Sequence, residues 1–159
     1  MTQRVPMTPE GYKKVLAEFK HVREVLRPQV VRDIEEARAH GDISENSEYE
    51  DAKERQAQIE GRVRELESRL ALAEVIDITR VTASERVIFG TTVDLEDVDT
   101  GEAFTYRIVG TEEADVKTGL VSFSSPIGRA LIGRSVGDEV KFDTPKGTRT
   151  VVINAVHYK

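Results

Sequence analysis

The sequence predicts an α+β protein. An N-terminal antiparallel coiled-coil hairpin (residues 1–78) precedes a C-terminal β-sheet domain with one short helix (residues 84–159). Apolar residues recur every three or four positions up to about residue 73, and every second position from about residue 87 onward. Three of the 11 glycines lie in residues 1–80 and eight in residues 81–159, as expected when helices precede strands and turns.

The first helical arm is predicted to run from Gly11 to His40. Its apolar residues have the spacing of a coiled-coil seam, which slips around Pro28. Because proline lacks a backbone N–H and crowds the preceding turn, we expect the helix to bend or break there. The seam positions are Tyr12, Val15, Phe19, Val22 and Leu26 before the proline, and Val30, Ile34 and Ala37 after it.

The second arm keeps a stricter pattern through four heptads, at Tyr49, Ala52, Gln56, Ile59, Val63, Leu66, Leu70 and Ala73. Between the arms, Gly41 suits the left-handed conformation that closes a helix, and Asp42 or Ser44 can cap the next helix. A connection this short makes the two helices antiparallel neighbours, each about 45 Å long. Every seam residue then has its partner in the same chain, so we expect a monomer.

The second half of the chain alternates with a period of two. The segments VIFGTTVDLEDV and AFTYRIVG are separated by the turn DTGE, and LVSFSS, DEVKFDT and TRTVVINAV follow. We expect five or six mostly antiparallel strands, with PIGRAL (Pro126 to Leu131) as a short helix between two of them. The shift in composition and the loop from Thr79 to Arg86 mark the domain boundary.

Composition excludes several classes of protein. The 159 residues contain no apolar stretch long enough to span a membrane, and the N-terminus lacks the apolar core of a secretory signal, so we expect a cytoplasmic protein with no membrane partner. The absence of cysteine excludes disulfides, thiol nucleophiles and cysteine-ligated metals. A formal net charge of −6 argues against a free-standing nucleic-acid binder, so any contact with nucleic acid must be local.

The turn between the arms is strongly acidic. Residues 42–51, DISENSEYED, contain five acidic residues and no basic one. Asp42 and Glu45 are three positions apart at a helix start, so their side chains can point at one region of space. They could simply form a capping box. Alternatively, two ionised carboxylates are half of a magnesium site, which another macromolecule with its own carboxylates and a phosphodiester could complete.

Basic residues flank this acidic turn. Arg38, Lys53 and Arg55 could guide an RNA phosphate, or pair on solvated helix faces with acids nearby, namely Glu35, Glu36, Asp51 or Glu54. Tyr49 is interpreted as seam packing, and Asn46 and Glu48 as possible supports of the acidic pair. His21, His40 and His157 have no spacing typical of a metal site, and we expect them to be solvated or packed.

Over nearly its whole length the chain resembles a known family. The segments RPQVVRDIEEARAHGDISENSEYEDAKERQ, VIFGTTVDLEDVDTGE, YRIVGTEEAD and SSPIGRALIGRSVGDEV are similar to the bacterial transcript cleavage factors of the GreA/GreB family. The match is most specific at GDISENSEY, and GTEEAD and TGE are more similar to GreA-type members. Ser47 stands where the family usually has alanine. The serine adds a hydroxyl without moving either acid.

The resemblance implies a mechanism. Family members bind bacterial RNA polymerase by inserting the coiled coil into its secondary channel, while an FKBP-like C-terminal domain docks at the channel rim. They bind no cofactor alone and stimulate the polymerase's own cleavage of backtracked RNA. The resemblance places the catalytic acids, which help to hold a second Mg²⁺ shared at the polymerase active site, at Asp42 and Glu45. It places contacts with the nascent RNA 3′ end at Arg38 and Lys53, near Arg55, and polymerase contacts at Ser124, Ser125 and Pro126.

Two other functions stay open. A regulator could occupy the same channel without supporting cleavage, and it would compete with substrate nucleotides without shortening RNA. The C-terminal domain could instead act as a chaperone or prolyl isomerase, which would need an aromatic-lined pocket. Its aromatic residues fall mostly at strand positions, where we expect core packing, so this function is the less favoured.

Overall fold

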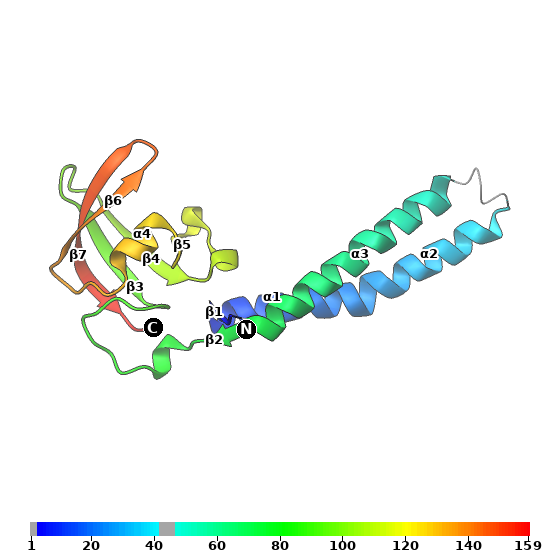
Figure 1. Ribbon diagram of the computed structural model, residues 1–159, viewed down its shortest axis with the longest axis horizontal. Helices are drawn as coiled ribbons and strands as arrows, with labels where there is room; N and C mark the ends of the chain where they lie inside the picture. Colours follow the sequence, from blue (N-terminus) through cyan, green and yellow to red (C-terminus); the bar gives the residue numbers. More distant parts are fainter. Residues whose placement is uncertain (1–2, 42–46) are drawn as a thin grey trace. The chain divides into compact units, whose positions relative to one another are not determined.

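The computed structural model describes residues 3–41 and 47–159, which form two compact units. A helical unit covers Tyr12–Ala73, and a globular unit combines Gln3–Gly11 with Glu74–Lys159. Figure 1 shows the long helical hairpin and the curled sheet with its short helix. The predicted fold class, a helical hairpin followed by a sheet domain, is confirmed. Within the described ranges, no helix is both long enough and apolar enough to cross a membrane.

The first arm of the hairpin consists of three consecutive segments. These are α1 (Pro9–His21), the π-helical turn η1 (Val22–Leu26) and α2 (Arg27–Ala39). The N–H of Arg27 donates to the carbonyl of Val22, five residues back, immediately before Pro28. A proline ring crowds the carbonyl of the previous turn, and the wider π turn makes room for it. The predicted irregularity at Pro28 is therefore present, one turn ahead of the proline.

The second arm is the continuous helix α3 (Ser47–Leu72). Phe19 and Val22 of the first arm pack against Val63 and Leu66 of α3, and Leu66 has no exposed surface. Farther along the first arm, the predicted seam positions Val30, Ile34 and Ala37 are also buried. The helical spacing read from the sequence therefore identifies the face that each arm buries.

Ion pairs bridge the arms beside this seam. The guanidinium of Arg62 donates to both oxygens of Glu18, at 2.6 and 2.8 Å, and that of Arg27 donates to both oxygens of Glu60, at 2.8 and 2.9 Å. The hydrogen bond to Arg62 lowers the pKa of Glu18, and the same bond raises the pKa of Arg62. Bidentate pairs of this kind restrict sliding of one helix along the other, because both N–H···O bonds form only when the two helices are aligned in a single register.

The globular unit is built on a five-stranded sheet with the order β5-β4-β3-β7-β6. Its strands are β3 (Thr92–Asp97), β4 (Ala103–Val109), β5 (Leu120–Ser122), β6 (Glu139–Thr144) and β7 (Gly147–His157). The pairs β3·β4, β3·β7 and β6·β7 are antiparallel, as predicted, whereas β5 runs parallel to β4. The chain between β4 and β5 forms two 3₁₀ turns, η4 (Thr111–Glu113) and η5 (Val116–Thr118), after which β5 begins beside Arg107 in the second half of β4.

The core of the globular unit lies between the sheet and α4 (Pro126–Leu131), the short helix predicted at PIGRAL. Val93 and Leu95 of β3 are buried together with Val151 and Ile153 of β7 and Leu131 of α4. The first strand was predicted to begin near Val87, but β3 begins only at Thr92. Gly90 has a φ of +90°, so the chain turns before the strand, although Val87 itself is fully buried.

Short elements complete the globular unit. The strand β1 (Val5–Met7) pairs with β2 (Ala73–Val75), and the N–H of Ile76 donates to the carbonyl of Met7 at 2.9 Å. A 3₁₀ turn, η3 (Ile78–Arg80), follows β2. The sequence pattern did not predict β1 or β2, because three residues are too few to show a period.

Candidate functional site

The predicted catalytic acids, Asp42 and Glu45, lie outside the described residues, as do Asn46 and the predicted cap Ser44. The helix ends on either side are described. Helix α2 ends at Ala39, the N–H of His40 donates to the carbonyl of Ala37 at 3.3 Å, and α3 begins at Ser47. Gly41 has a φ of +110°, which confirms the left-handed position expected from the sequence and explains the use of glycine there.

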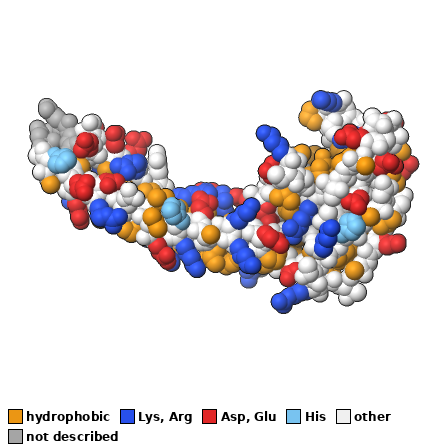
Figure 2. All heavy atoms as spheres, turned by 180° about the vertical axis from the view of Figure 1, so that it is seen from behind, with side chains coloured by type: hydrophobic (Ala, Val, Ile, Leu, Met, Phe, Trp, Pro, Cys, Tyr) orange, Lys and Arg blue, Asp and Glu red, His pale blue; other side chains and the backbone are white. Residues whose placement is uncertain are grey.

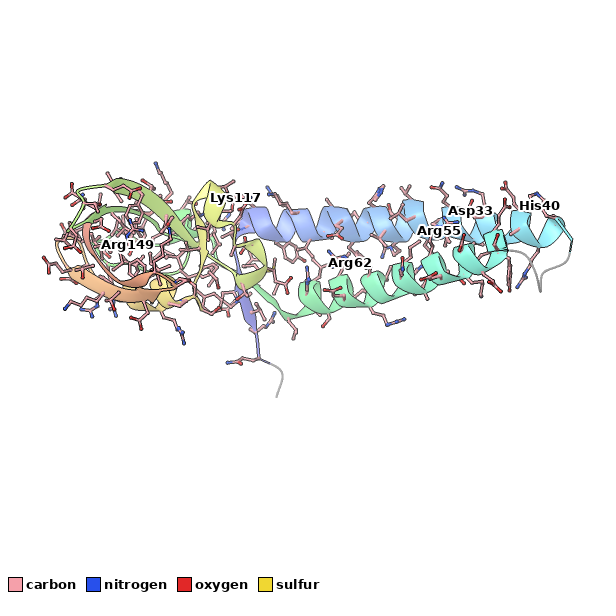
Figure 3. All side chains as sticks on the ribbon, turned by 90° about the horizontal axis from the view of Figure 1, so that it is seen from above. Asp33, His40, Arg55, Arg62, Lys117 and Arg149 are labelled. Carbon is pink, nitrogen blue, oxygen red and sulfur yellow. The ribbon has the colours of Figure 1, made fainter. Side chains whose placement is uncertain are left out.

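A groove of about 400 Å³ lies between α2 and α3 beside these helix ends. Four acidic side chains line it together with Ala37, His40 and Arg55; the acids are Asp33, Glu36, Glu48 and Asp51. His40 Nδ1 lies 3.4 Å from a carboxylate oxygen of Glu48, so this pair links the end of α2 to the start of α3. Figure 3 shows that Asp33, Arg55 and His40 lie in the end of the hairpin that leads to residues 42–46. The described end of the hairpin is therefore predominantly acidic.

The three predicted RNA-contacting cations, Arg38, Lys53 and Arg55, have different surroundings, and all three are exposed. The guanidinium of Arg38 lies 5.7 Å from the centre of the Tyr49 ring, and the ammonium of Lys53 donates to Gln56 at 3.2 Å. Arg55 donates to Asp33 at 3.1 Å.

Arg55 thus forms an ion pair with a helix acid, but its partner is Asp33, which was not among the acids named for it. Asp33 is 22 residues away on the other arm, which neighbour spacing along one helix does not reveal. Within residues 3–41 and 47–159, neither Arg38 nor Lys53 has an acidic side chain within ion-pair distance. Unlike the charge of Arg55, the charges of Arg38 and Lys53 are not neutralised by a carboxylate of the described residues.

The predicted polymerase-binding residues form a tightly bonded loop before α4. The hydroxyl of Ser125 donates to the carbonyl of Ser122 at 2.7 Å and accepts from the N–H of Gly128 at 3.1 Å, which makes it the cap of the helix. Pro126 occupies the first turn, where its missing N–H costs nothing. Ser124 and Pro126 are exposed, whereas Ser125 is half-buried. The loop therefore presents Ser124 and Pro126 on a fixed backbone.

Two further residues support this loop and were not predicted from the sequence. The hydroxyl of Ser124 lies 2.8 Å from that of Ser122 and 3.1 Å from that of Thr111, which belongs to η4. Isolated serines and threonines occur in every loop, so nothing in the sequence distinguishes Thr111 and Ser122. Their contribution depends on the packing of β5 beside β4.

Charges of both signs alternate over the helical hairpin, as Figure 2 shows for one face. Among the described residues, no group of three or more His, Asp or Glu side chains is arranged to hold a metal ion. His157 Nε2 lies 2.9 Å from Asp94 Oδ2, and this contact, with a hydrogen bond from Thr105, lowers the pKa of Asp94. His157 lies in β7 and is half-buried.

Comparison with known proteins covers almost the whole chain. Residues 5–75 match the family described as "Transcription elongation factor, N-terminal", and residues 82–158 match "Transcription elongation factor, GreA/GreB, C-term". The transcription elongation factor GreA of Anaeromyxobacter sp. (strain K) is 52% identical over 156 residues, which cover 98% of this chain and 93% of the relative. GreA of Xanthomonas axonopodis pv. citri (strain 306) is 49% identical over 155 residues, 98% of each chain. The solved structure of GreA factor homolog 1 from Thermus thermophilus is 32% identical and covers 98% of this chain and 99% of its own, with a TM-score of 0.44.

The chain belongs to the GreA/GreB family of transcription elongation factors, because both halves match and full-length relatives share about half of its residues. The family predicted from GDISENSEY and the neighbouring segments is therefore confirmed. Its relatives are named as elongation factors and not as enzymes. The positions of its functional residues remain predictions.

Proposed function

We propose that this elongation factor binds bacterial RNA polymerase, inserts its helical hairpin into the secondary channel, and stimulates the polymerase's own cleavage of backtracked RNA. Family membership supports the role in elongation. The observation that carries the mechanism is the helical hairpin together with the acidic segment DISENSEYED, which follows α2 in the sequence and extends into the first turn of α3. A slender two-helix arm can enter a channel that a globular domain cannot, and this arm carries its acidic cluster at one end.

In this mechanism Asp42 and Glu45 supply carboxylate ligands to a second Mg²⁺ shared with the polymerase active site. When bound there, the ion would polarise the phosphodiester and lower the pKa of an attacking water. The factor itself holds no cofactor, because two carboxylates alone bind Mg²⁺ weakly. The exposed cations of Arg38 and Lys53 would contact the RNA 3′ end, and Ser124 and Pro126 would contact the channel rim.

The test is a cleavage assay on an arrested, backtracked elongation complex with Mg²⁺. Asp42→Asn and Glu45→Gln should each lower the stimulated cleavage rate by at least about tenfold, the loss seen when even a supporting group of a metal site is removed. Polymerase binding, measured by competition with labelled wild type, should stay unchanged. Glu54→Gln is the matched control, since it removes one exposed negative charge farther along α3 and should behave as wild type.

Other results would contradict the proposal. Full stimulation by both variants would exclude a role for the acidic pair, and shortening of free RNA by the factor alone would show an independent nuclease. Inhibition of nucleotide addition without any cleavage would indicate the channel-blocking regulator instead. The isomerase alternative is not supported, because Phe89, Phe104, Tyr106 and Phe123 all pack against the core of the globular unit.

A further inference from the structure

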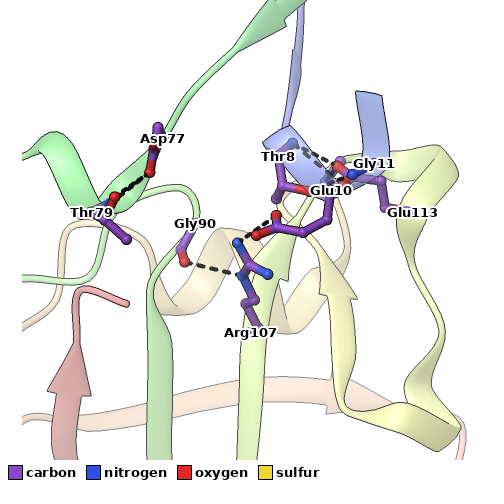
Figure 4. Close-up of polar contacts among 9 residues, drawn as sticks. Thr8, Glu10, Gly11, Asp77, Thr79, Gly90, Arg107 and Glu113 are labelled. Carbon is purple, nitrogen blue, oxygen red and sulfur yellow. Dashed lines mark hydrogen bonds and ion pairs between the residues drawn. The ribbon is translucent and has the colours of Figure 1, made fainter. Parts of the chain in front are cut away.

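The start of helix α1 lies inside the globular unit, although the rest of the helix belongs to the hairpin. Residues Gln3–Gly11 group with the globular unit, and α1 begins within them at Pro9. Thr8, immediately before the helix, is only 2% exposed, and Gly11 is buried. Figure 4 shows these residues beside Glu113 of η4, which is 105 positions away from Thr8 in the sequence. Burial of a helix start requires partners for its unpaired N–H groups.

Thr8 supplies one half of a capping box. Its hydroxyl oxygen accepts a hydrogen bond from the N–H of Gly11 at 3.0 Å, so Thr8 occupies the N-cap position and Gly11 the third helical position. In a complete capping box, a Glu or Gln at that third position accepts a hydrogen bond from the N–H of the N-cap residue. Gly11 has no side chain to do so. The helix therefore needs an acceptor from elsewhere.

Glu113 supplies the missing carboxylate. Its Oε2 accepts from the N–H of Thr8 at 3.1 Å and from the N–H of Gly110 at 2.8 Å, and its Oε1 accepts from the hydroxyl of Thr8. The carboxylate occupies the space that a side chain at Gly11 would need, because a Cβ atom there would lie 2.0 Å from Oε1. Because Gly11 has no side chain, the carboxylate of Glu113 can occupy the place that a Glu or Gln of the helix itself takes in a capping box.

A second contact lies next to this cap. The guanidinium of Arg107 in β4 lies 3.3 Å from a carboxylate oxygen of Glu10 and donates to the carbonyl of Gly90 at 3.3 Å. Two side chains of the globular unit, Arg107 of β4 and Glu113 of η4, therefore bind the start of α1. The ion pair between Arg107 and Glu10 is exposed to solvent and contributes little stability alone. The hydrogen bonds to Glu113 come from buried donors, so their loss costs more.

We propose that Glu113 is a positioning residue for cleavage stimulation, because it caps α1 from the globular unit and keeps the start of the hairpin from fraying. The inference rests on the proposed function. Without Glu113, the N–H and the hydroxyl of Thr8 lose their acceptor, and the start of α1 is free to fray. A catalytic group at the far end of a loosely held arm spends less time in its productive position, which lowers the rate at saturation.

The experiment uses the full chain with Glu113→Ala, Glu113→Gln and Thr8→Ser. Lys117→Ala is the control, because Lys117 is an exposed side chain in the same loop. Amide hydrogen exchange is measured at Thr8 and Gly11, and cleavage is measured against factor concentration. Glu113→Ala should speed exchange at both amides by at least about tenfold. It should also lower the maximal cleavage rate several-fold, with the half-saturating concentration unchanged.

The conservative variants should keep most of the effect. Thr8→Ser retains the N–H and the hydroxyl and should match wild type, and Glu113→Gln retains one acceptor oxygen and should be intermediate. Should Glu113→Ala prevent folding of the globular unit, Glu113→Gln decides the outcome by the same two readouts. Faster exchange with an unchanged maximal rate would reduce Glu113 to a structural cap and overturn the positioning role. Unchanged exchange would overturn the cap itself. Absence of stimulation by wild type would instead refute the proposed function and, with it, the positioning role, while exchange would still report on the cap.

Discussion

Gly11→Ala should destabilise the globular unit, although the same change usually stabilises a helix. A Cβ atom at Gly11 would lie 2.0 Å from Oε1 and 2.4 Å from Cδ of Glu113, so the carboxylate must leave its place. It then loses its hydrogen bonds to the N–H and hydroxyl of Thr8, each worth about 1.5–3 kcal/mol with a charged acceptor. Helix propensity offsets about 1 kcal/mol of this loss. The expected net change is a destabilisation of at least about 2 kcal/mol.

The sign should reverse when Glu113 is also replaced by alanine. The space beside Gly11 is then empty, so only the helix propensity of alanine remains, and Gly11→Ala should stabilise Glu113→Ala by about 1 kcal/mol. The coupling free energy between the two positions is therefore at least about 3 kcal/mol, the upper end of the range for residues in contact. Gly61→Ala is the matched control, because its Cβ would meet only Arg64 Nη2 at 3.9 Å and it should simply stabilise α3.

The assay is urea unfolding of wild type, Gly11→Ala, Glu113→Ala and the double variant. Unfolding is monitored by the NMR methyl signals of Val93 and Val151. Both residues are fully buried in the globular unit, so they report on its unfolding even if the hairpin unfolds separately. Midpoints are compared at constant m-value. Additivity within about 0.5 kcal/mol would refute the inferred contact between the glycine and the carboxylate.

Two further predictions concern the seam and the histidine of β7. Leu66→Ala should lower the free energy of unfolding by about 2–5 kcal/mol, because Leu66 is fully buried between the arms. Its control is Glu67→Ala on the exposed face, which should change stability by less than about 0.5 kcal/mol. Circular dichroism of the helices in urea measures both variants. His157→Gln should raise the pKa of Asp94 toward its ordinary value of 3.8, measured by carbon NMR titration. Because folding lowers this pKa, the carboxylate stabilises the fold above 3.8 and loses that contribution as the pH falls through the lowered value, so the advantage of wild type over His157→Gln should vanish in acid. An unchanged Asp94 titration in the variant would exclude the histidine as the cause.

Much of the architecture follows from local patterns. The spacing of Phe19, Val22 and Leu66 predicts the buried seam, because a helix repeats every 3.6 residues and each turn presents its apolar side chain to the same partner. The helix at PIGRAL was equally readable, since Ser125 is a cap and Pro126 suits a first turn. The acidic segment around Asp42 was also evident from composition, and its role stays a prediction.

Long-range polar contacts were not readable in this way. Arg55 pairs with Asp33 on the other arm, and Thr111 supports Ser124 from the turn beside it, and neither contact follows a period in the sequence. The parallel pairing of β5 with β4 was missed for the same reason, since three residues carry no information on strand direction.

The sequence by itself determined the family, the two-part organisation and the faces that are buried, because these depend on repeated apolar side chains and on a long shared motif. Only the tertiary structure showed that α1 begins in the globular unit and that Glu113 completes its cap. Gly11 looks like an ordinary helix-weakening glycine until the carboxylate beside it is seen. A hydrogen bond needs its two atoms about 3 Å apart, and only the folded chain brings together residues 105 positions apart in the sequence.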